Sequence, residues 1–235
     1  MTKRYKHIGI VAVSAPGAAL CYQTICTEFE KITGNRYEHP EVSMHSFSFK
    51  DYMERIEAGD WEGVADLLVA SSEKLAAIGA DFAICPDNTV HIAFDEVVKR
   101  SPIPWMHIAE EVAKDAKERG FNKLVILGTK FLMESDVYPS RLKKYGIDWV
   151  IPDSQQRRVI NDIIFNELVY GIVRPDSRSK LATIISNLAR KEGGDAVVLG
   201  CTELPLILDD KISPIPVLDS TRILARRALR EAVKP

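Results

Sequence analysis

The chain has 235 residues, of which 46% are hydrophobic and 27% are charged, and its formal net charge is −2. This length allows one large core or two domains of about 115 residues each. The nearly balanced charge argues against a basic surface for nucleic acid or an anionic membrane. The four cysteines form no CxxC pair, which indicates neither a disulfide framework nor a zinc site, so we expect a reducing, cytoplasmic compartment.

The N-terminal region partly resembles a signal peptide, because basic residues precede an apolar run over 8–20. Pro16 and Gly17 interrupt that run, and we expect instead a buried strand over 8–13, a loop, and a helix from Ala18. No apolar stretch approaches the ~20 residues that a membrane span requires. We therefore expect a chain that is neither exported nor membrane-bound.

Short β-branched runs alternate along the chain with segments of helical period, which is typical of parallel strands joined by crossover helices. The expected strands are 8–13, 42–47, 81–85, 104–107, 123–128, 148–151, 195–199 and 215–218. The expected later helices are 61–79, 109–120, 159–170, 177–192 and 221–233. Gly79, Gly120 and Gly193 stand where helix-ending glycines belong. The pattern predicts an α/β fold.

Two stretches of the chain, 79–89 and 193–203, read as copies of each other, and a Ser-Pro-Ile-Pro sequence follows both of them. In this alignment Asp87 and Cys201 take the same place, eight residues after the first glycine of each copy. The duplication predicts two pseudo-symmetric parallel-sheet domains with the active site in the cleft between them. We place residues 1–100 and about 211–235 in the first half, and residues 101–210 in the second.

Ligands of open parallel sheets gather beyond the carboxyl ends of the strands. The polar residues that follow the expected strands are therefore candidates for binding a small anion through backbone N–H, hydroxyl and amide groups. They include Ser14, Asn88, Thr89, Thr129, Thr202 and Glu203. The sequence has no GxGxxG and no GxxxxGK[ST] motif, so the usual nucleotide-binding loops are missing.

Several of these residues carry a family resemblance. The Gly-Cys-Thr-Glu sequence at 200–203 and the Asn-Thr-Val-His sequence at 88–91 resemble the G-C-T-E and C-N-T-x-H signatures of the cofactor-independent aspartate/glutamate racemase superfamily. Further segments, at 45–49, 59–61, 127–134 and 160–168, are similar to its aspartate racemase branch. The resemblance covers nearly the whole chain.

The resemblance implies a 1,1-proton transfer, in which one residue removes the α-hydrogen of an amino acid and an opposite residue returns a proton to the other face. It implies two cysteines in these roles, with no pyridoxal phosphate and no metal. Cys201 matches the second cysteine, whereas Asp87 stands in place of the first. The expected partners are an amino-acid or dicarboxylate substrate and a second copy of the chain in a homodimer.

An aspartate can serve as the acid/base group at this position. An exposed Asp87 with a pKa of about 3.9 would be a poor proton donor at neutral pH, whereas a thiol of about 8.5 keeps its proton. Burial in a closed cleft beside a substrate carboxylate would raise the pKa of Asp87 and allow proton exchange. Helix N–H groups would in turn lower the pKa of the Cys201 thiol. An Asp/Cys pair therefore predicts a preference for one enantiomer.

Each candidate also has a structural interpretation. Asp87 would cap the helix that opens after it, and Cys85 would be either a displaced catalytic thiol or a buried apolar residue. We expect His91 to be a structural hydrogen-bond partner rather than a base. Glu203 would orient the site or bind an amino group, and Lys130 would be solvated.

Two other classes of function stay open. The first is a single-cysteine decarboxylase or a cysteine-dependent cis-trans isomerase of small dicarboxylates, which product analysis would separate from racemisation. The second is a non-catalytic binder of an amino acid or dicarboxylate, which would bind its ligand without exchanging the α-proton with solvent. Cys21 and Cys26 lie on the first expected helix without the spacing or the position of ligands, and we expect both in the core.

Overall fold

The computed structural model describes residues 5–234. Its strands are β1 (Ile8–Ala12), β2 (Val42–Ser46), β3 (Phe82–Ile84), β4 (Trp105–Met106), β5 (Lys123–Gly128), β6 (Asp148–Val150), β7 (Ala196–Gly200) and β8 (Val217–Asp219). They form two four-stranded parallel sheets with the orders β2-β1-β3-β4 and β6-β5-β7-β8. Because both sheets take their strands in the same sequence order, the predicted α/β class with two similar parallel sheets is confirmed.

The chain divides into two compact units. One contains residues up to Ile108 together with those from Thr221 onward, and the other contains Ala109–Ser220. The segment from about residue 211 is shared between them, because β8 pairs with β7 in the second sheet. Only the helix that follows β8 lies with the first unit.

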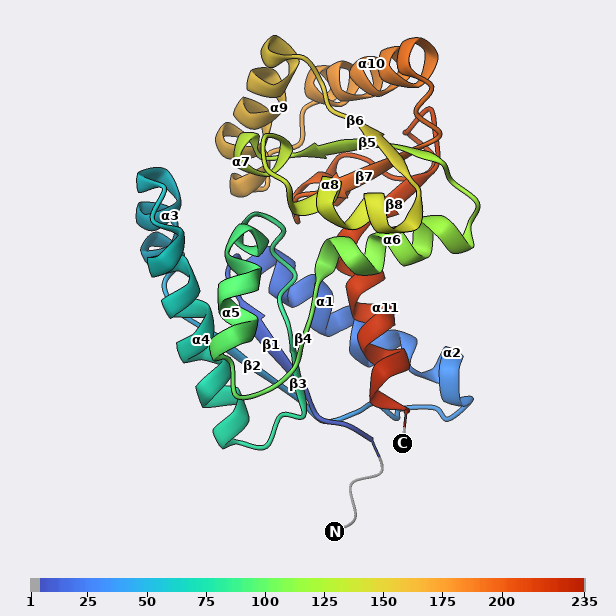
Figure 1. Cartoon of the computed structure of the whole chain (residues 1–235). Helices are drawn as coiled ribbons and strands as arrows, with labels where there is room; N and C mark the ends of the chain where they lie inside the picture. The colour runs from blue at the N-terminus through green and yellow to red at the C-terminus, as the bar shows by residue number, and fades with distance from the viewer. Residues whose placement is uncertain (1–4, 235) are drawn as a thin grey trace. The chain divides into compact units, whose positions relative to one another are not determined.

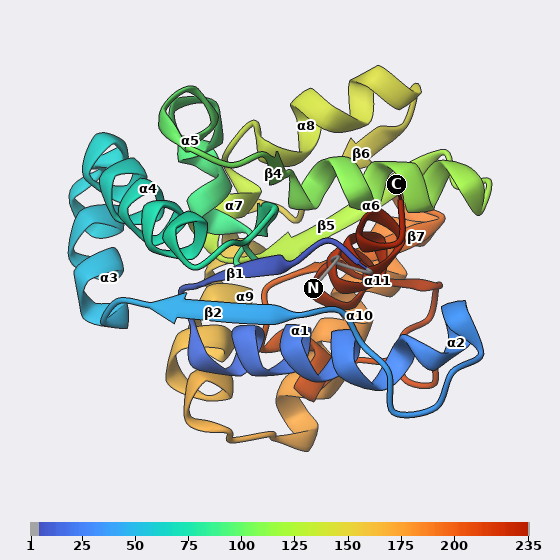
Figure 2. The ribbon, with the colours of Figure 1, turned by 90° about the horizontal axis from the view of Figure 1, so that it is seen from below.

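Helices cover both faces of the first sheet (Figures 1 and 2). Ile8 and Ile10 of β1 pack against Ile25 and Leu224, which belong to the helices on one face, α1 and α11. The helix α4 contacts β1, β2 and β3 from the other face. The helices of this unit are α1 (Ala15–Glu28), α2 (Glu30–Thr33), α3 (Phe49–Ala58), α4 (Trp61–Ala77), η1 (Thr89–Ala93), α5 (Phe94–Arg100) and α11 (Ser220–Ala232).

The second sheet has its main apolar core on one face, where Val125 and Val197 pack with Ile160 of α9 and Leu181 of α10. The helices α6 and α8 lie on the opposite side of the sheet (Figure 1). The helices of this unit are α6 (Ile108–Glu118), α7 (Lys130–Met133), α8 (Val137–Leu142), η2 (Lys143–Tyr145), α9 (Ser154–Asn166), η3 (Leu168–Tyr170), α10 (Pro175–Glu192) and η4 (Leu204–Leu206).

The two Ser-Pro-Ile-Pro sequences have the same local structure. Ser101 Oγ donates to the Ile103 carbonyl at 2.8 Å, and Ser213 Oγ donates to the Ile215 carbonyl at 2.6 Å. In both copies the serine Oγ also accepts the N–H of the same isoleucine, at 3.3 Å and 3.4 Å. The internal repeat therefore extends from the sequence to individual hydrogen bonds.

The aspartates that open the two repeats also make matching contacts. Asp81 accepts the His7 N–H at 2.6 Å, and Asp195 accepts the Asn122 N–H at 2.7 Å. Each aspartate thus joins the start of the third strand of its sheet to the start of the first. This contact fixes the register between the two strands. The register in turn sets where the strands end and where the polar residues beyond them lie.

The structure corrects the expected start of the first helix. The loop predicted before Ala18 is helical from Ala15, because Pro16 lies in the first turn, where its missing N–H breaks no helical hydrogen bond. The helix α9 likewise begins before residue 159, because Asp153 and Gln156 form a reciprocal capping box. The helices α3, α5 and α8 were not predicted.

Candidate active site

Each sheet presents a group of polar residues at the carboxyl ends of two neighbouring strands. In the first unit, Ser14 follows β1 and Asp87 follows β3, and these strands are paired in the sheet. In the second unit, Thr129 follows β5 and Cys201 follows β7, which are also paired. The predicted site residues therefore lie in two groups, one in each unit, at the carboxyl ends of equivalent strands, and we call each group a half-site.

The Asp87 carboxylate is built into the turn after β3. Its Oδ1 accepts the N–H of Thr89 at 3.0 Å and the N–H of Val90 at 3.3 Å. These contacts are those of a side-chain cap, and a short 3₁₀ helix, η1, follows directly. The predicted capping interaction of Asp87 is therefore present, while Asn88 and Thr89 lie buried beside it.

His91 stabilises this turn through hydrogen bonds of its ring nitrogens. Its Nε2 accepts the Ile108 N–H at 3.2 Å, so the ring proton lies on Nδ1, which donates to the Asp87 carbonyl at 2.8 Å. The ring also contacts His107 and stacks on Phe94. Both nitrogens of His91 are thus used in hydrogen bonds, as expected for a structural partner rather than a base.

Cys85 is fully buried. Burial, together with the nearby Asp87 carboxylate, raises the pKa of its thiol well above the usual value. Its Sγ lies 4.0 Å from the Asp87 carbonyl oxygen, the acceptor of a weak thiol contact. A thiol that resists ionisation in this way is a poor base, so the core interpretation of Cys85 fits the structure better than that of a displaced catalytic thiol. Cys21 also lies in the core, whereas Cys26 is only partly buried.

The second half-site is centred on a buried carboxylate. Cys201 Sγ donates to Glu203 Oε2 at 2.9 Å, and Thr202 Oγ1 donates to the same oxygen at 2.7 Å. All three residues are buried. This contact agrees with the orienting role that the sequence left open for Glu203, beside the binding of an amino group.

The end of β7 is also packed very closely. A Cβ at Gly200 would lie 2.7 Å from the Leu127 carbonyl oxygen and 2.5 Å from Leu132 Cδ2, and a Cβ at Gly128 would lie 2.7 Å from the same Leu132 atom. Only glycine fits at these two positions. Leu132 of α7 therefore rests directly on the residue that precedes Cys201.

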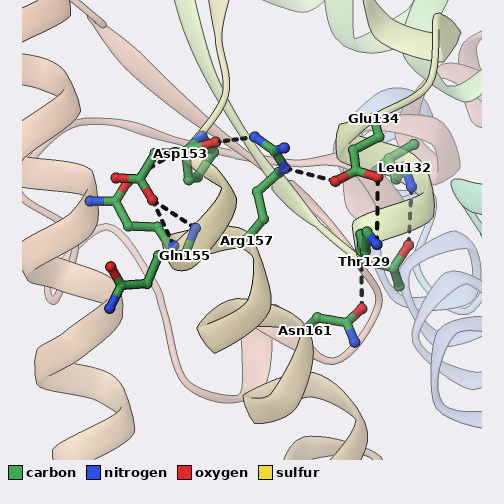
Figure 3. Close-up of polar contacts among 10 residues, drawn as sticks. Thr129, Leu132, Glu134, Asp153, Gln155, Arg157 and Asn161 are labelled. Atoms are coloured by element: carbon green, nitrogen blue, oxygen red, sulfur yellow. Dashed lines mark hydrogen bonds and ion pairs between the residues drawn. The ribbon is translucent and has the colours of Figure 1, made fainter.

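Thr129 caps the short helix α7, because its Oγ1 accepts the Leu132 N–H at 3.2 Å (Figure 3). Asn161 Oδ1 accepts the N–H of Lys130, the first residue of α7, at 3.0 Å. The Lys130 side chain is exposed, as predicted. Asn161 lies 32 positions beyond Thr129 in a separate helix, and only its place in the 160–168 segment of the resemblance marked it in the sequence.

The structure also bears on metal and membrane binding. Among residues 5–234, no group of three or more His, Cys, Asp or Glu side chains is placed to hold a metal ion. Within the same residues, no helix combines the length and the apolar character that crossing a bilayer needs.

Residues 10–228 match the model of the Asp/Glu/Hydantoin racemase family. The chain belongs to this family. The family membership confirms the predicted enzyme class, an isomerase of the racemase type. It also agrees with the resemblance that the two signatures carry.

Individual relatives extend the comparison over almost the whole chain. The broad specificity amino-acid racemase RacX of Bacillus subtilis is 27% identical over 224 residues, covering 93% of this chain and 95% of that protein. The crystal structure of an aspartate racemase homologue from Pyrococcus horikoshii is 31% identical with a TM-score of 0.83, covering 97% of this chain and 100% of that one. A glutamate racemase from Francisella tularensis shares the fold, with 15% identity, a TM-score of 0.70, and coverage of 96% of this chain and 80% of that one.

Proposed function

We propose that this member of the family is a cofactor-independent racemase of aspartate or glutamate type, in which Asp87 and Cys201 act on opposite faces of the substrate α-carbon. One group removes the α-hydrogen and the other donates a proton to the opposite face. The resulting inversion needs two acid/base groups, and each unit supplies one of them.

The equivalence of the two strand ends carries this proposal. Asp87 follows β3 and Cys201 follows β7, and these strands hold the same position in sheets of the same order. A duplicated fold with related halves supplies two comparable groups, as a two-base reaction requires. The family match over residues 10–228 supports the reaction class.

The contacts of each half-site suggest which group starts as the base. Asp87 Oδ1 accepts two N–H groups, an environment that suits a carboxylate oxygen. The Cys201 thiol instead donates to the Glu203 carboxylate and so holds a proton. In this resting arrangement Asp87 removes the α-hydrogen and Cys201 is the proton donor, so one enantiomer is the preferred substrate.

The remaining site residues would bind the substrate. We assign the α-carboxylate to the hydroxyl and amide groups of Asn88, Thr89 and Thr202, with Ser14 and Thr129 contacting the same ligand. All five are buried at the strand ends. Hydroxyl, amide and backbone N–H donors are suitable partners for a carboxylate.

The cap made by Asp87 gives one rival interpretation a specific basis. If Asp87 only caps η1, Cys201 is the single acid/base residue, and the chain is a one-cysteine decarboxylase or isomerase. Capping and catalysis are nevertheless compatible, because a carboxylate has two oxygens with about four lone-pair sites. Exchange of Asp87 for asparagine separates the two roles.

The function is tested by incubating L- and D-aspartate and L- and D-glutamate with the protein in D₂O and following the α-proton by NMR. We expect wild-type protein to exchange the α-proton of at least one of these amino acids, and Cys201→Ala to exchange none while keeping its fold. Exchange by Cys201→Ala at the wild-type rate would remove Cys201 from the mechanism.

Three further properties belong to the same proposal. The reaction proceeds without pyridoxal phosphate or metal, so hydroxylamine and EDTA should leave the exchange rate unchanged. The protein acts in the cytoplasm, where its thiols stay reduced. It acts as a homodimer, which sedimentation in solution will test.

A further inference from the structure

The helix α9 holds both ends of the short helix α7 (Figure 3). At the first end, Asn161 Oδ1 accepts the Lys130 N–H at 3.0 Å. At the other end, Arg157 Nε donates to Glu134 Oε1 at 3.0 Å. Asn161 and Arg157 are four residues apart on α9 and so project from the same face of that helix. We call these two contacts the α9 clamp.

The clamp residues belong to a helix, α9, whose position is fixed by its own contacts. Arg157 Nη1 also donates to the Pro152 carbonyl at 2.7 Å, and the Arg157 side chain is only 19% exposed. The capping box of Asp153 and Gln156 fixes the start of α9. Ile160 of the same helix lies in the core of the unit. The positions of the clamp residues are therefore set by the core rather than by the helix α7.

The short helix α7 depends on contacts with residues outside it. A helix of four residues, as α7 is, has too few internal hydrogen bonds to be stable alone, and the N–H groups of its first turn need outside acceptors. Thr129 Oγ1 supplies one acceptor and Asn161 Oδ1 supplies the next. The place of the Thr129 hydroxyl therefore depends on Asn161.

The clamp also reaches the thiol side of the half-site. Leu132, in the middle of α7, packs against Gly128 and Gly200 so closely that a Cβ at either glycine would overlap it. Gly200 is bonded directly to Cys201. A shift of α7 would therefore move Thr129 and release the packing above the strand end that carries Cys201.

We propose that Asn161 and Arg157 are positioning residues of the racemase site, acting through α7 on Thr129 and Cys201. This inference rests on the function proposed above. The two residues touch no reacting atom; they fix the geometry of residues that do. A misplacement of about 1 Å can cost on the order of a hundredfold in rate, so a loosened clamp has a measurable effect.

The test compares three variants of the full chain. Asn161→Ala removes the acceptor of the Lys130 N–H, whereas Asn161→Asp keeps an oxygen in the same place. Asp162→Ala is the matched control, because Asp162 is the exposed next residue of α9 and lies outside the clamp. The thermal midpoint of each variant is measured first, so that the comparison is made between folded proteins.

Two readouts need no substrate. By NMR-detected hydrogen exchange, the Lys130 amide should exchange about two- to tenfold faster in Asn161→Ala, because about one hydrogen bond of ordinary strength is lost. By mass spectrometry, iodoacetamide should alkylate Cys201 severalfold faster in that variant, while Cys26 of the other unit keeps its rate. Asn161→Asp and Asp162→Ala should match the wild type in both measurements.

The third readout is the α-proton exchange of the amino acid that the wild type accepts. Asn161→Ala should lower kcat/KM by about tenfold or more, and Asn161→Asp should restore most of it. Unchanged Lys130 exchange and Cys201 alkylation in Asn161→Ala would overturn the clamp, whatever the activity. Changed alkylation with unchanged kcat/KM would overturn the positioning role. A wild type that alters no amino acid would instead overturn the proposed function while the two substrate-free readouts still decide the clamp.

Discussion

Replacement of Asp87 separates the two roles that this residue holds in the structure. Asparagine keeps an Oδ1 atom that can accept the N–H groups of Thr89 and Val90, now at 3.0 Å and 3.3 Å, but it cannot exchange a proton. Asp87→Asn should therefore retain the cap and lose the chemistry. General acid/base catalysis contributes roughly 10²–10⁴ in rate, so we expect a fall of at least about a hundredfold in α-proton exchange.

The stability of the same site gives the second half of the test. Loss of a side-chain cap costs about 0.5–2 kcal/mol, and one of the two contacts of Asp87 is long, so Asp87→Ala should lose about 1 kcal/mol. Asp87→Asn should lose less than about 0.5 kcal/mol. Urea unfolding monitored by circular dichroism measures both values, and NMR in D₂O measures the exchange.

An Asp87→Asn protein that exchanges the α-proton at the wild-type rate would show that Asp87 takes no part in the proton transfer. Asp87 would then be a cap alone, and the chain would be a one-cysteine enzyme or a binder. An Asp87→Cys variant supplies the opposite control. It should bring the exchange rates of the two enantiomers closer together, because both faces would then carry a thiol.

Three other substitutions test the structural account. Tyr138→Phe should lose about 1 kcal/mol, because that buried hydroxyl is hydrogen-bonded to Ser220, and an unchanged or higher stability in urea unfolding would contradict the contact. Gly200→Ala should lose about 1–3 kcal/mol and most activity, because its Cβ would lie 2.7 Å from a carbonyl oxygen, and a stable, active variant would show that the strand end can relax. The Arg226 guanidinium holds the pKa of Glu28 below its usual 4.5. The pair of Glu28 and Arg226 therefore contributes fully to the free energy of unfolding above that pH, and its contribution disappears as the pH falls through the lowered pKa. Glu28→Gln should therefore lose up to about 1 kcal/mol at neutral pH and nothing at about pH 2, and an equal loss at both would contradict the electrostatic origin.

The strand positions and the duplication were predictable from the sequence, because both depend on local patterns. Buried strands such as β1 and β7 are short β-branched runs, and the repeat is visible as similar residues in the same order. The helix-ending glycines also have a local cause. Gly79, Gly120 and Gly193 all adopt positive φ, which glycine tolerates best.

The contacts that organise the half-sites depend on tertiary structure and could not be predicted in this way. The hydrogen bond from Ile108 to His91 joins residues 17 positions apart, and the one from Lys130 to Asn161 joins residues 31 positions apart. Neither separation corresponds to a regular spacing of a helix or a strand, so the sequence pattern gives no sign of these contacts. The short helices were missed for a similar reason, since α8 has only six residues and carries too little periodicity to stand out.

The two-base mechanism is tested most directly by the fate of solvent deuterium in the first turnovers. In D₂O, one enantiomer of the amino acid that the protein accepts is converted to a small extent, and mass spectrometry then measures deuterium in the product and in the recovered substrate. Because Asp87 removes the α-hydrogen while Cys201 delivers a solvent-derived deuteron to the other face, the product should be fully deuterated and the recovered substrate nearly free of deuterium. Equal labelling of both at low conversion would mean that a single residue removes and returns the proton, which contradicts the opposed Asp87 and Cys201 pair.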